Sequence, residues 1–193
     1  MLETLVNRAV PCYDKYIMIG DNQSRADNQQ ERLQLISEDI GNYLSGFADG
    51  EGSFNISIVN RNRDYRSGWK IVASFNISQR DPTIPLLFQK TLDCGTIRYR
   101  QDGVCYFEVR KIDDLNEIVR SFFYQFPLRS KRQAERLRLL LLAVELLARG
   151  EHLNHKGLET VLSIREKMIS NRPRMYKMTD VLENPQRLHA KPT

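Results

Sequence analysis

Hydrophobic and polar positions between residues 37 and 110 follow a pattern that predicts two helices and two hairpins. Residues 37–50 are mostly small or apolar and end abruptly at Gly50 and Gly52, as a helix would. Apolar and polar positions then alternate with a period of two in four strand-like segments: residues 54–59, 70–77, 96–100 and 105–110. Between the second and third segments, Asp81-Pro82 starts a helix that extends to about Leu92.

Beyond residue 110 the pattern is helical. Helices are predicted from about Asp113 to Tyr124, from Lys131 to Ala148 and from about Gly157 to Ser170, with breaks at Pro127 and Gly150. This order gives an α+β fold with an αββαββα core, in which helices back a four-stranded antiparallel sheet, followed by C-terminal helices. One face of such a sheet packs on the helices, and the other is left for solvent or a ligand.

The 193 residues suit one compact domain with an extension at each end. Residues 1–36 show little periodicity and are expected to form an N-terminal extension outside the core. The domain proper covers residues 37–170, and residues 171–193 are expected to be a basic C-terminal tail. The sequence contains no internal repeat.

The net charge of +5 and the pI near 9.2 favour a polyanionic partner, because the basic residues gather in clusters. The open sheet face would carry polar side chains that can donate to or accept from base edges in a DNA groove. These residues are Asn55, Ser57, Arg61, Lys70, Ser74, Asn76, Arg98, Arg100, Tyr106, Glu108 and Arg110. The alternative is an ordinary solvated sheet face whose charges serve solubility.

Other classes of protein are disfavoured by the cysteines, histidines and apolar runs. The three cysteines are widely spaced, which argues against a disulfide framework or a zinc ribbon and fits a reducing compartment. His152 and His155 have no accompanying cysteine or acidic zinc-binding pattern. The most hydrophobic run, residues 139–148, is too short to cross a bilayer, so no membrane partner is expected.

The helix over residues 37–50 carries the strongest chemical signal. Ser37 can cap its start, and Gly46 and Gly50 lie four apart on one face, where a second helix could approach closely. At its end, unpaired backbone carbonyls coincide with the carboxylate of Glu51. Carbonyl and carboxylate oxygens are ligands that a hard divalent cation prefers, so a metal site beside a subunit interface is predicted.

The segment Tyr43-Leu-Ser-Gly-Phe-Ala-Asp-Gly-Glu-Gly-Ser-Phe54 resembles the LAGLIDADG motif of homing endonucleases. The resemblance extends over residues 37–170 and is most specific around this motif. It implies phosphodiester hydrolysis of duplex DNA with Mg²⁺, or another divalent cation such as Mn²⁺, held by Glu51 and the carbonyl of Gly50. This sequence has Glu51 where the family name has Asp.

Two further site residues are implied by the resemblance. Phe75-Asn-Ile-Ser-Gln79 is similar to the strand end at which homodimeric members keep a catalytic Gln, which assigns the ordering of water to Gln79. Leu128-Arg-Ser-Lys131 is similar to the segment that carries a basic residue near the scissile phosphate, which assigns that role to Lys131, with Arg132 as the alternative. Where those members have an Arg four positions after the Gln, this chain has Thr83, and Arg80 could supply the charge.

A single motif implies a homodimer formed through the motif helices at Gly46 and Gly50. Such a dimer would bind a long pseudo-palindromic site of roughly 20 base pairs and cut both strands, leaving short 3′ overhangs. The first alternative is an RNA maturase that assists splicing of its host intron, with intron RNA as partner. The second is a non-catalytic DNA-binding regulator. The expected location is a reducing compartment that holds the target genome, either an organelle or a prokaryotic cytoplasm.

Overall fold

The computed structural model describes residues 35–60, 69–168 and 175–182. Arg61, Cys12 and most of the two predicted extensions lie outside these ranges. The described elements begin with α2 (Glu38–Glu51), β1 (Ser53–Asn60), β2 (Trp69–Gln79), α3 (Thr83–Leu92), β3 (Thr96–Tyr99) and β4 (Cys105–Val109). They continue with α4 (Ile112–Asp114), η2 (Leu115–Val119), α5 (Arg120–Gln125), α6 (Lys131–Ala148), η3 (Glu151–Leu153), α7 (His155–Lys167) and α8 (Met178–Leu182). The predicted α+β fold and its αββαββα order are confirmed.

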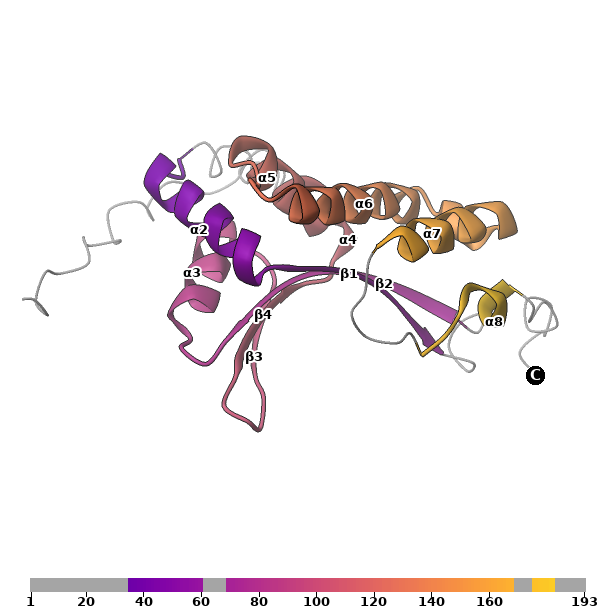
Figure 1. The fold of residues 1–193 in the computed structure, drawn as a ribbon, viewed down its shortest axis with the longest axis horizontal. Helices are drawn as coiled ribbons and strands as arrows, with labels where there is room; N and C mark the ends of the chain where they lie inside the picture. The colour runs from indigo at the N-terminus through magenta and orange to yellow at the C-terminus, as the bar shows by residue number, and fades with distance from the viewer. Residues whose placement is uncertain (1–34, 61–68, 169–174, 183–193) are drawn as a thin grey trace, which may run out of the picture.

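The four strands form one antiparallel sheet in the order β1-β2-β4-β3. Hairpins join β1 to β2 and β3 to β4, and the middle of the sheet is made by β2 against β4. The second hairpin turns at Gly103, whose φ of 79° suits glycine. In Figure 1, α6 and α7 lie above β1 and β2, whereas the β3–β4 hairpin extends away from the helices.

The core fills the space between the helices and one face of the sheet. Every second residue of β1, β2 and β4 faces it, which explains the alternation in the sequence. Phenylalanine rings dominate the centre: Phe54 stacks on Phe75 at 5.0 Å between ring centroids, and Phe88 of α3 stacks on Phe107 at 5.8 Å. Because these rings are almost fully buried, they hold α3 and the sheet as one unit.

A second apolar cluster lies at the far ends of β1 and β2. Ile58 and Trp69 pack there with side chains of α7 and with Val181 of α8, and Tyr176 meets the Trp69 ring edge-on at 4.9 Å. The helix α8 was not expected, because it is short and lies in a segment that was assigned to the tail. Among the described helices, none is long and apolar enough to cross a membrane.

Two local expectations differ from the structure. The helix predicted from Asp113 to Tyr124 contains a π-helical turn, η2, between α4 and α5, which lets Leu115, Ile118 and Val119 all be buried. Ser37 precedes α2 with extended backbone angles, but its side chain accepts no capping hydrogen bond. The predicted Ser37 cap is therefore wrong in its side-chain contact, although the helix starts where expected.

Candidate functional site

The end of α2 is fixed by a close contact between the backbones of Ala48 and Gly52. Glu51 is the last helical residue and is exposed, and the Gly52 N–H donates to the Ala48 carbonyl at 2.9 Å. A Cβ on Gly52 would lie 2.4 Å from that same carbonyl oxygen, so only glycine fits here. Glycine thus allows the chain to turn straight from α2 into β1 and leaves the Glu51 carboxylate at the surface.

The glycines of α2 divide between two faces of the helix. Gly41 faces inward, where an added Cβ would lie 2.3 Å from the Phe126 ring. Gly46 and Gly50 are exposed, and an added Cβ would meet nothing within 4 Å. Tyr43, which is half exposed, shares this outer face. The outer face of α2 is therefore flat and open along the two glycines that the sequence assigned to the dimer interface.

Asp49 joins the end of α2 to the start of α6. Its carboxylate accepts the Arg129 N–H at 2.7 Å and the Ser130 N–H at 3.2 Å, across a sequence separation of about 80 residues. Ser130 is the N-cap of α6 and its hydroxyl accepts the Gln133 N–H at 3.4 Å. A negative carboxylate at this position also satisfies the helix dipole. The segment carrying Lys131 is thereby held against the helix that carries Glu51.

Gln133 provides the second link at this junction. Its side chain is 8% exposed, and its Nε2 donates to the Gly52 carbonyl at 2.8 Å and to the Ala48 carbonyl at 3.5 Å. Its Oε1 is buried and accepts no hydrogen bond from the described residues. Gln133 and Asp49 together clamp the backbone on both sides of Gly50 and Glu51. Neither residue was identified from the sequence, although Asp49 lies inside the motif.

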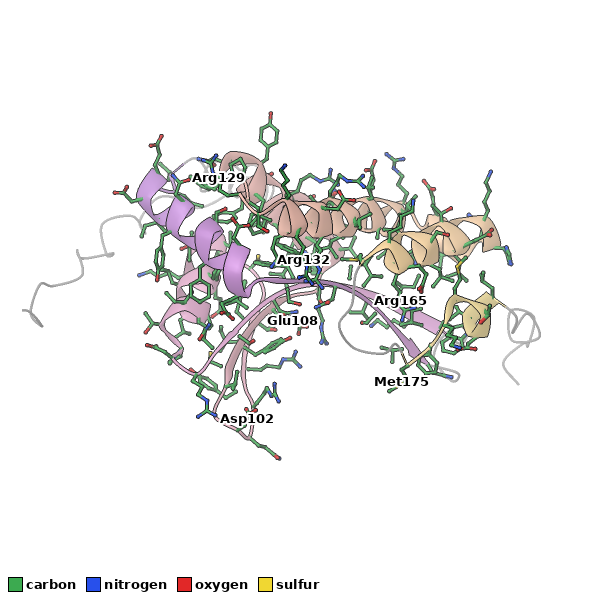
Figure 2. All side chains as sticks on the ribbon, in the orientation of Figure 1. Asp102, Glu108, Arg129, Arg132, Arg165 and Met175 are labelled. Carbon is green, nitrogen blue, oxygen red and sulfur yellow. The ribbon has the colours of Figure 1, made fainter. Side chains whose placement is uncertain are left out.

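The basic candidates lie at this same junction. Lys131 and Arg132 are both exposed in the first turn of α6. Figure 2 shows Arg132 close to the place where α2 passes into β1, in agreement with the hydrogen bond from the neighbouring Gln133 to Gly52. Gln79 is the last residue of β2 and is half-buried opposite Cys105 of β4. The catalytic roles of Lys131, Arg132 and Gln79 remain predictions.

Thr83, which stands where the homodimeric members have an Arg, has a structural role in this chain. It begins α3, and its N–H and hydroxyl both donate to the Asp81 carboxylate, at 2.9 and 2.6 Å. These bonds to Thr83 lower the pKa of Asp81. Arg80, the suggested replacement for the missing charge, is exposed directly after β2.

The residues at the end of α2 can supply some, but not all, of the ligands that a metal ion needs. A helix leaves its last carbonyls without intrahelical donors, and Gly50 and Glu51 are exposed at that end of α2. Their carbonyl and carboxylate oxygens suit Mg²⁺ or Ca²⁺. Within the described ranges no cluster of three or more His, Cys, Asp or Glu side chains could hold a metal ion. The remaining ligands would have to be water, a phosphate or a second copy of the chain.

The outer face of the sheet carries the predicted DNA-contacting residues, with differing accessibility. Ser57, Lys70, Arg98, Arg100 and Arg110 are exposed, and Asn55 and Tyr106 are half-buried. Ser74 and Asn76 are 7% and 5% exposed, because β2 is a central strand and its neighbours cover them. Whether any of these residues contacts DNA remains a prediction.

An ion-pair cluster occupies the β3–β4 part of this face. Glu108 is only 5% exposed and pairs with Arg98 and with Arg110, the latter at 2.9 Å. The Arg98 guanidinium also lies over the Tyr106 ring, 5.9 Å from its centroid. Burial, and then the charge of Glu108, raise the pKa of Tyr106. Arg100 follows β3 and pairs with Asp102 at 3.1 Å, at the tip of the hairpin (Figure 2).

Comparison with known proteins identifies relatives of this arrangement. A family model described as LAGLIDADG endonuclease matches residues 44–139. The chain is 30% identical over 131 residues to a "Probable intron-encoded endonuclease 2" of Neurospora crassa, covering 66% of this chain and 27% of that protein. It is 39% identical over 67 residues to "DNA endonuclease I-CvuI" of Chlorella vulgaris, covering 34% of this chain and 41% of that protein. The chain thus spans about a quarter of the length of the Neurospora relative.

Solved structures share the fold. The homing endonuclease I-TnaI superimposes with a TM-score of 0.62 at 30% identity, covering 68% of this chain and 89% of that one. The meganuclease I-CpaMI, described as bound to uncleaved DNA, superimposes with a TM-score of 0.66 at 25% identity, covering 79% and 51%. I-CvuI in complex with the I-CreI target has a TM-score of 0.68 at 24% identity, covering 82% and 98%, and at this identity supports the fold alone.

Proposed function

Because the chain belongs to the LAGLIDADG endonuclease family, we propose that it is a site-specific homing endonuclease that hydrolyses both strands of a long duplex DNA site. The observation that carries the proposal is the junction at the end of α2. There Asp49 and Gln133 hold the end of α2, which carries the exposed Glu51, at the start of α6, whose first turn carries the exposed Lys131 and Arg132. An acidic metal ligand beside a cation suits attack on a phosphodiester.

The chain's own residues would divide the work of cleavage. Glu51 and the carbonyl of Gly50 would hold Mg²⁺ or another divalent cation, which when bound would lower the pKa of a water and offset charge on the phosphate. Lys131 or Arg132, projecting from the start of α6, would stabilise the charge that develops on the scissile phosphate. Gln79 would hydrogen-bond the water from the end of β2.

The polar face of the sheet would bind the DNA. It lies opposite the helices, and Arg98 of β3 and Arg110, just beyond the end of β4, project from it with their side chains more than half exposed. Arg side chains suit both phosphate contacts and guanine edges. The DNA-bound description of I-CpaMI supports this use of the same fold.

A homodimer would complete the site. The open face of α2 along Gly46 and Gly50 would pack on the same face of a second copy. A twofold axis at this contact would bring two copies of Glu51 together and so give each DNA strand one carboxylate. The target would then be a pseudo-palindrome of roughly 20 base pairs, cut to leave short 3′ overhangs. The described cysteines, Cys94 and Cys105, are free and buried, which suits a reducing compartment that holds a genome, such as an organelle.

Cleavage selection tests the proposal. The purified protein is incubated with a library of duplexes in Mg²⁺ and in EDTA, and the cut ends are sequenced. We expect a discrete pseudo-palindromic site that is cut only with Mg²⁺. Glu51→Gln should abolish cutting but retain specific binding, whereas Glu38→Gln, at the other end of α2, should still cut. Mg²⁺-dependent cutting by Glu51→Gln would refute the site, and tight binding of intron RNA without cutting would favour the maturase.

A further inference from the structure

Glu108 occupies an unusual position for a side chain on a DNA-binding surface. It lies on the polar face of β4 and is almost fully buried, with each carboxylate oxygen engaged by a different arginine. Oε2 pairs with Nη2 of Arg98 from β3, and Oε1 forms an ion pair with Nε of Arg110, just beyond the end of β4, at 2.9 Å. A carboxylate in this state cannot reach a cytosine amino group in the groove.

We propose that Glu108 is a positioning residue for DNA specificity. Its carboxylate holds Arg98 and Arg110 so that the two guanidinium groups can each read a guanine. This inference rests on the proposed DNA-binding function of the sheet. It replaces the expectation that Glu108 contacts a base directly.

The ion pairs leave the outward ends of both guanidinium groups available. Arg110 is held through Nε, which leaves its two terminal nitrogens, and Arg98 is held through a single terminal nitrogen. A bidentate contact with guanine needs two parallel N–H groups, which either arginine can still supply. Their side chains are 53% and 56% exposed, so they project beyond the buried carboxylate.

Arg98 is restrained from a second direction. Its guanidinium lies over the Tyr106 ring, directly across the β3–β4 ladder. Tyr106 is itself half-buried, so it offers a fixed surface. With a carboxylate on one side and an aromatic ring beneath it, Arg98 loses little further side-chain freedom when it binds a base.

The geometry limits how far apart the two bases can lie. A carboxylate that pairs with guanidinium groups through both oxygens keeps the two guanidinium carbons within roughly 8 Å of each other. Base pairs in B-DNA rise by about 3.4 Å per step. The two arginines should therefore read positions no more than about three base pairs apart in each half-site.

The test measures binding of the selected target and of every single-base substitution in it, with Ca²⁺ in place of Mg²⁺ so that binding is measured without cleavage. We expect two guanine positions within three base pairs at which the wild-type protein discriminates by about 5- to 150-fold. Arg98→Gln should abolish the preference at one position and Arg110→Gln at the other. Glu108→Gln should weaken both preferences to less than about 5-fold while leaving other positions unchanged.

Asp102→Asn is the matched control, because it removes an equal charge from the exposed Arg100–Asp102 pair on the same hairpin. It should raise affinity for all duplexes alike without changing either guanine preference. Loss of a cytosine preference in Glu108→Gln, at a position that neither arginine variant affects, would make Glu108 a direct reader and overturn the proposal. An unchanged base profile would also overturn it.

If Glu108→Gln does not fold, as judged by circular dichroism, Arg98→Lys and Arg110→Lys carry the test. They keep the charge but lose the planar fork, so each should lose its guanine preference while retaining overall affinity. Retention of both preferences would overturn the proposal. If the wild-type protein shows no base preference, both the proposed function and the proposed role of Glu108 are refuted. If the wild-type protein selects a discrete target but Glu108→Gln keeps the same base preferences, only the role of Glu108 is refuted.

Discussion

Replacing Asp49 by alanine removes the carboxylate that ties the end of α2 to the start of α6. The Arg129 and Ser130 N–H groups then lose their acceptor, and the first turn of an 18-residue helix loses a negative charge at its positive end. Ser130 is part-buried, so water can replace the carboxylate only incompletely. The substitution therefore tests whether this junction, and not the sheet alone, holds the two halves of the catalytic site.

The expected loss of stability in Asp49→Ala follows from the hydrogen bonds that the Asp49 carboxylate accepts. One short hydrogen bond and one longer, shared bond to a charged acceptor are worth about 2–3 kcal/mol together. The loss of a favourable helix-dipole interaction is part of the same charge effect and is not added separately. For a domain of this size, a change of that order corresponds to a fall in melting temperature of about 4–12 °C. Asp49→Asn keeps one carbonyl acceptor and should lose about half as much.

Urea unfolding of the wild type and variants measures these changes. The single tryptophan, Trp69, is buried in the second apolar cluster and reports unfolding by fluorescence, and circular dichroism checks that the transition is two-state. Glu159→Ala, an exposed acid on α7, is the control and should change the free energy of unfolding by less than about 0.5 kcal/mol. A loss below that same limit in Asp49→Ala would refute the reasoning.

Two further predictions concern the α2 surface and the buried thiol. Gly46→Leu should prevent dimer formation, measured by sedimentation, because the leucine side chain fills the open face of α2. Gly46→Ala should have a much smaller effect. An unchanged dimer in Gly46→Leu would exclude this interface. Burial raises the pKa of Cys94 to about 12, so this thiol should resist alkylation at pH 8 in a Cys12→Ser protein until the chain unfolds. The unfolded Cys94 thiol ionises from about pH 9, whereas the folded one does not, so the free energy of unfolding of the parent should fall between pH 9 and 12. This fall should be less steep in Cys94→Ala. Parallel curves for the two proteins would refute the prediction.

The sheet could be predicted because its alternation is a local property. The alternate apolar positions in the middle of β1 and β2, such as Ile56, Phe75 and Ile77, face the same phenylalanine-rich core, so a period of two is enough to identify both the strands and their buried face. The same pattern says which face a side chain occupies but not how far its neighbours cover it. Asn76 was therefore expected to be accessible and is buried between Ser53 of β1 and Glu108 of β4.

The junction could be predicted only in part. Glu51 and the glycines of α2 could be found because their signal lies within one short segment. Asp49 meets Arg129 and Ser130 across about 80 residues, and a single sequence gives no sign of such a pairing. The π-helical turn η2 was missed for a related reason, since one extra residue in a helical turn barely alters the spacing of apolar positions.

The β3–β4 hairpin differs from the α2–α6 junction in how much the fold depends on it. β3 is an edge strand whose residues are exposed or half-buried, and the turn that follows it is open to solvent. Exposed side chains such as Arg100 can be exchanged at a cost of about 0.5 kcal/mol or less. The exposed arginines proposed to read the target can therefore be exchanged with little loss of stability, whereas the packed junction that carries Glu51 cannot. A lineage could thus acquire new target sites without rebuilding its catalytic centre.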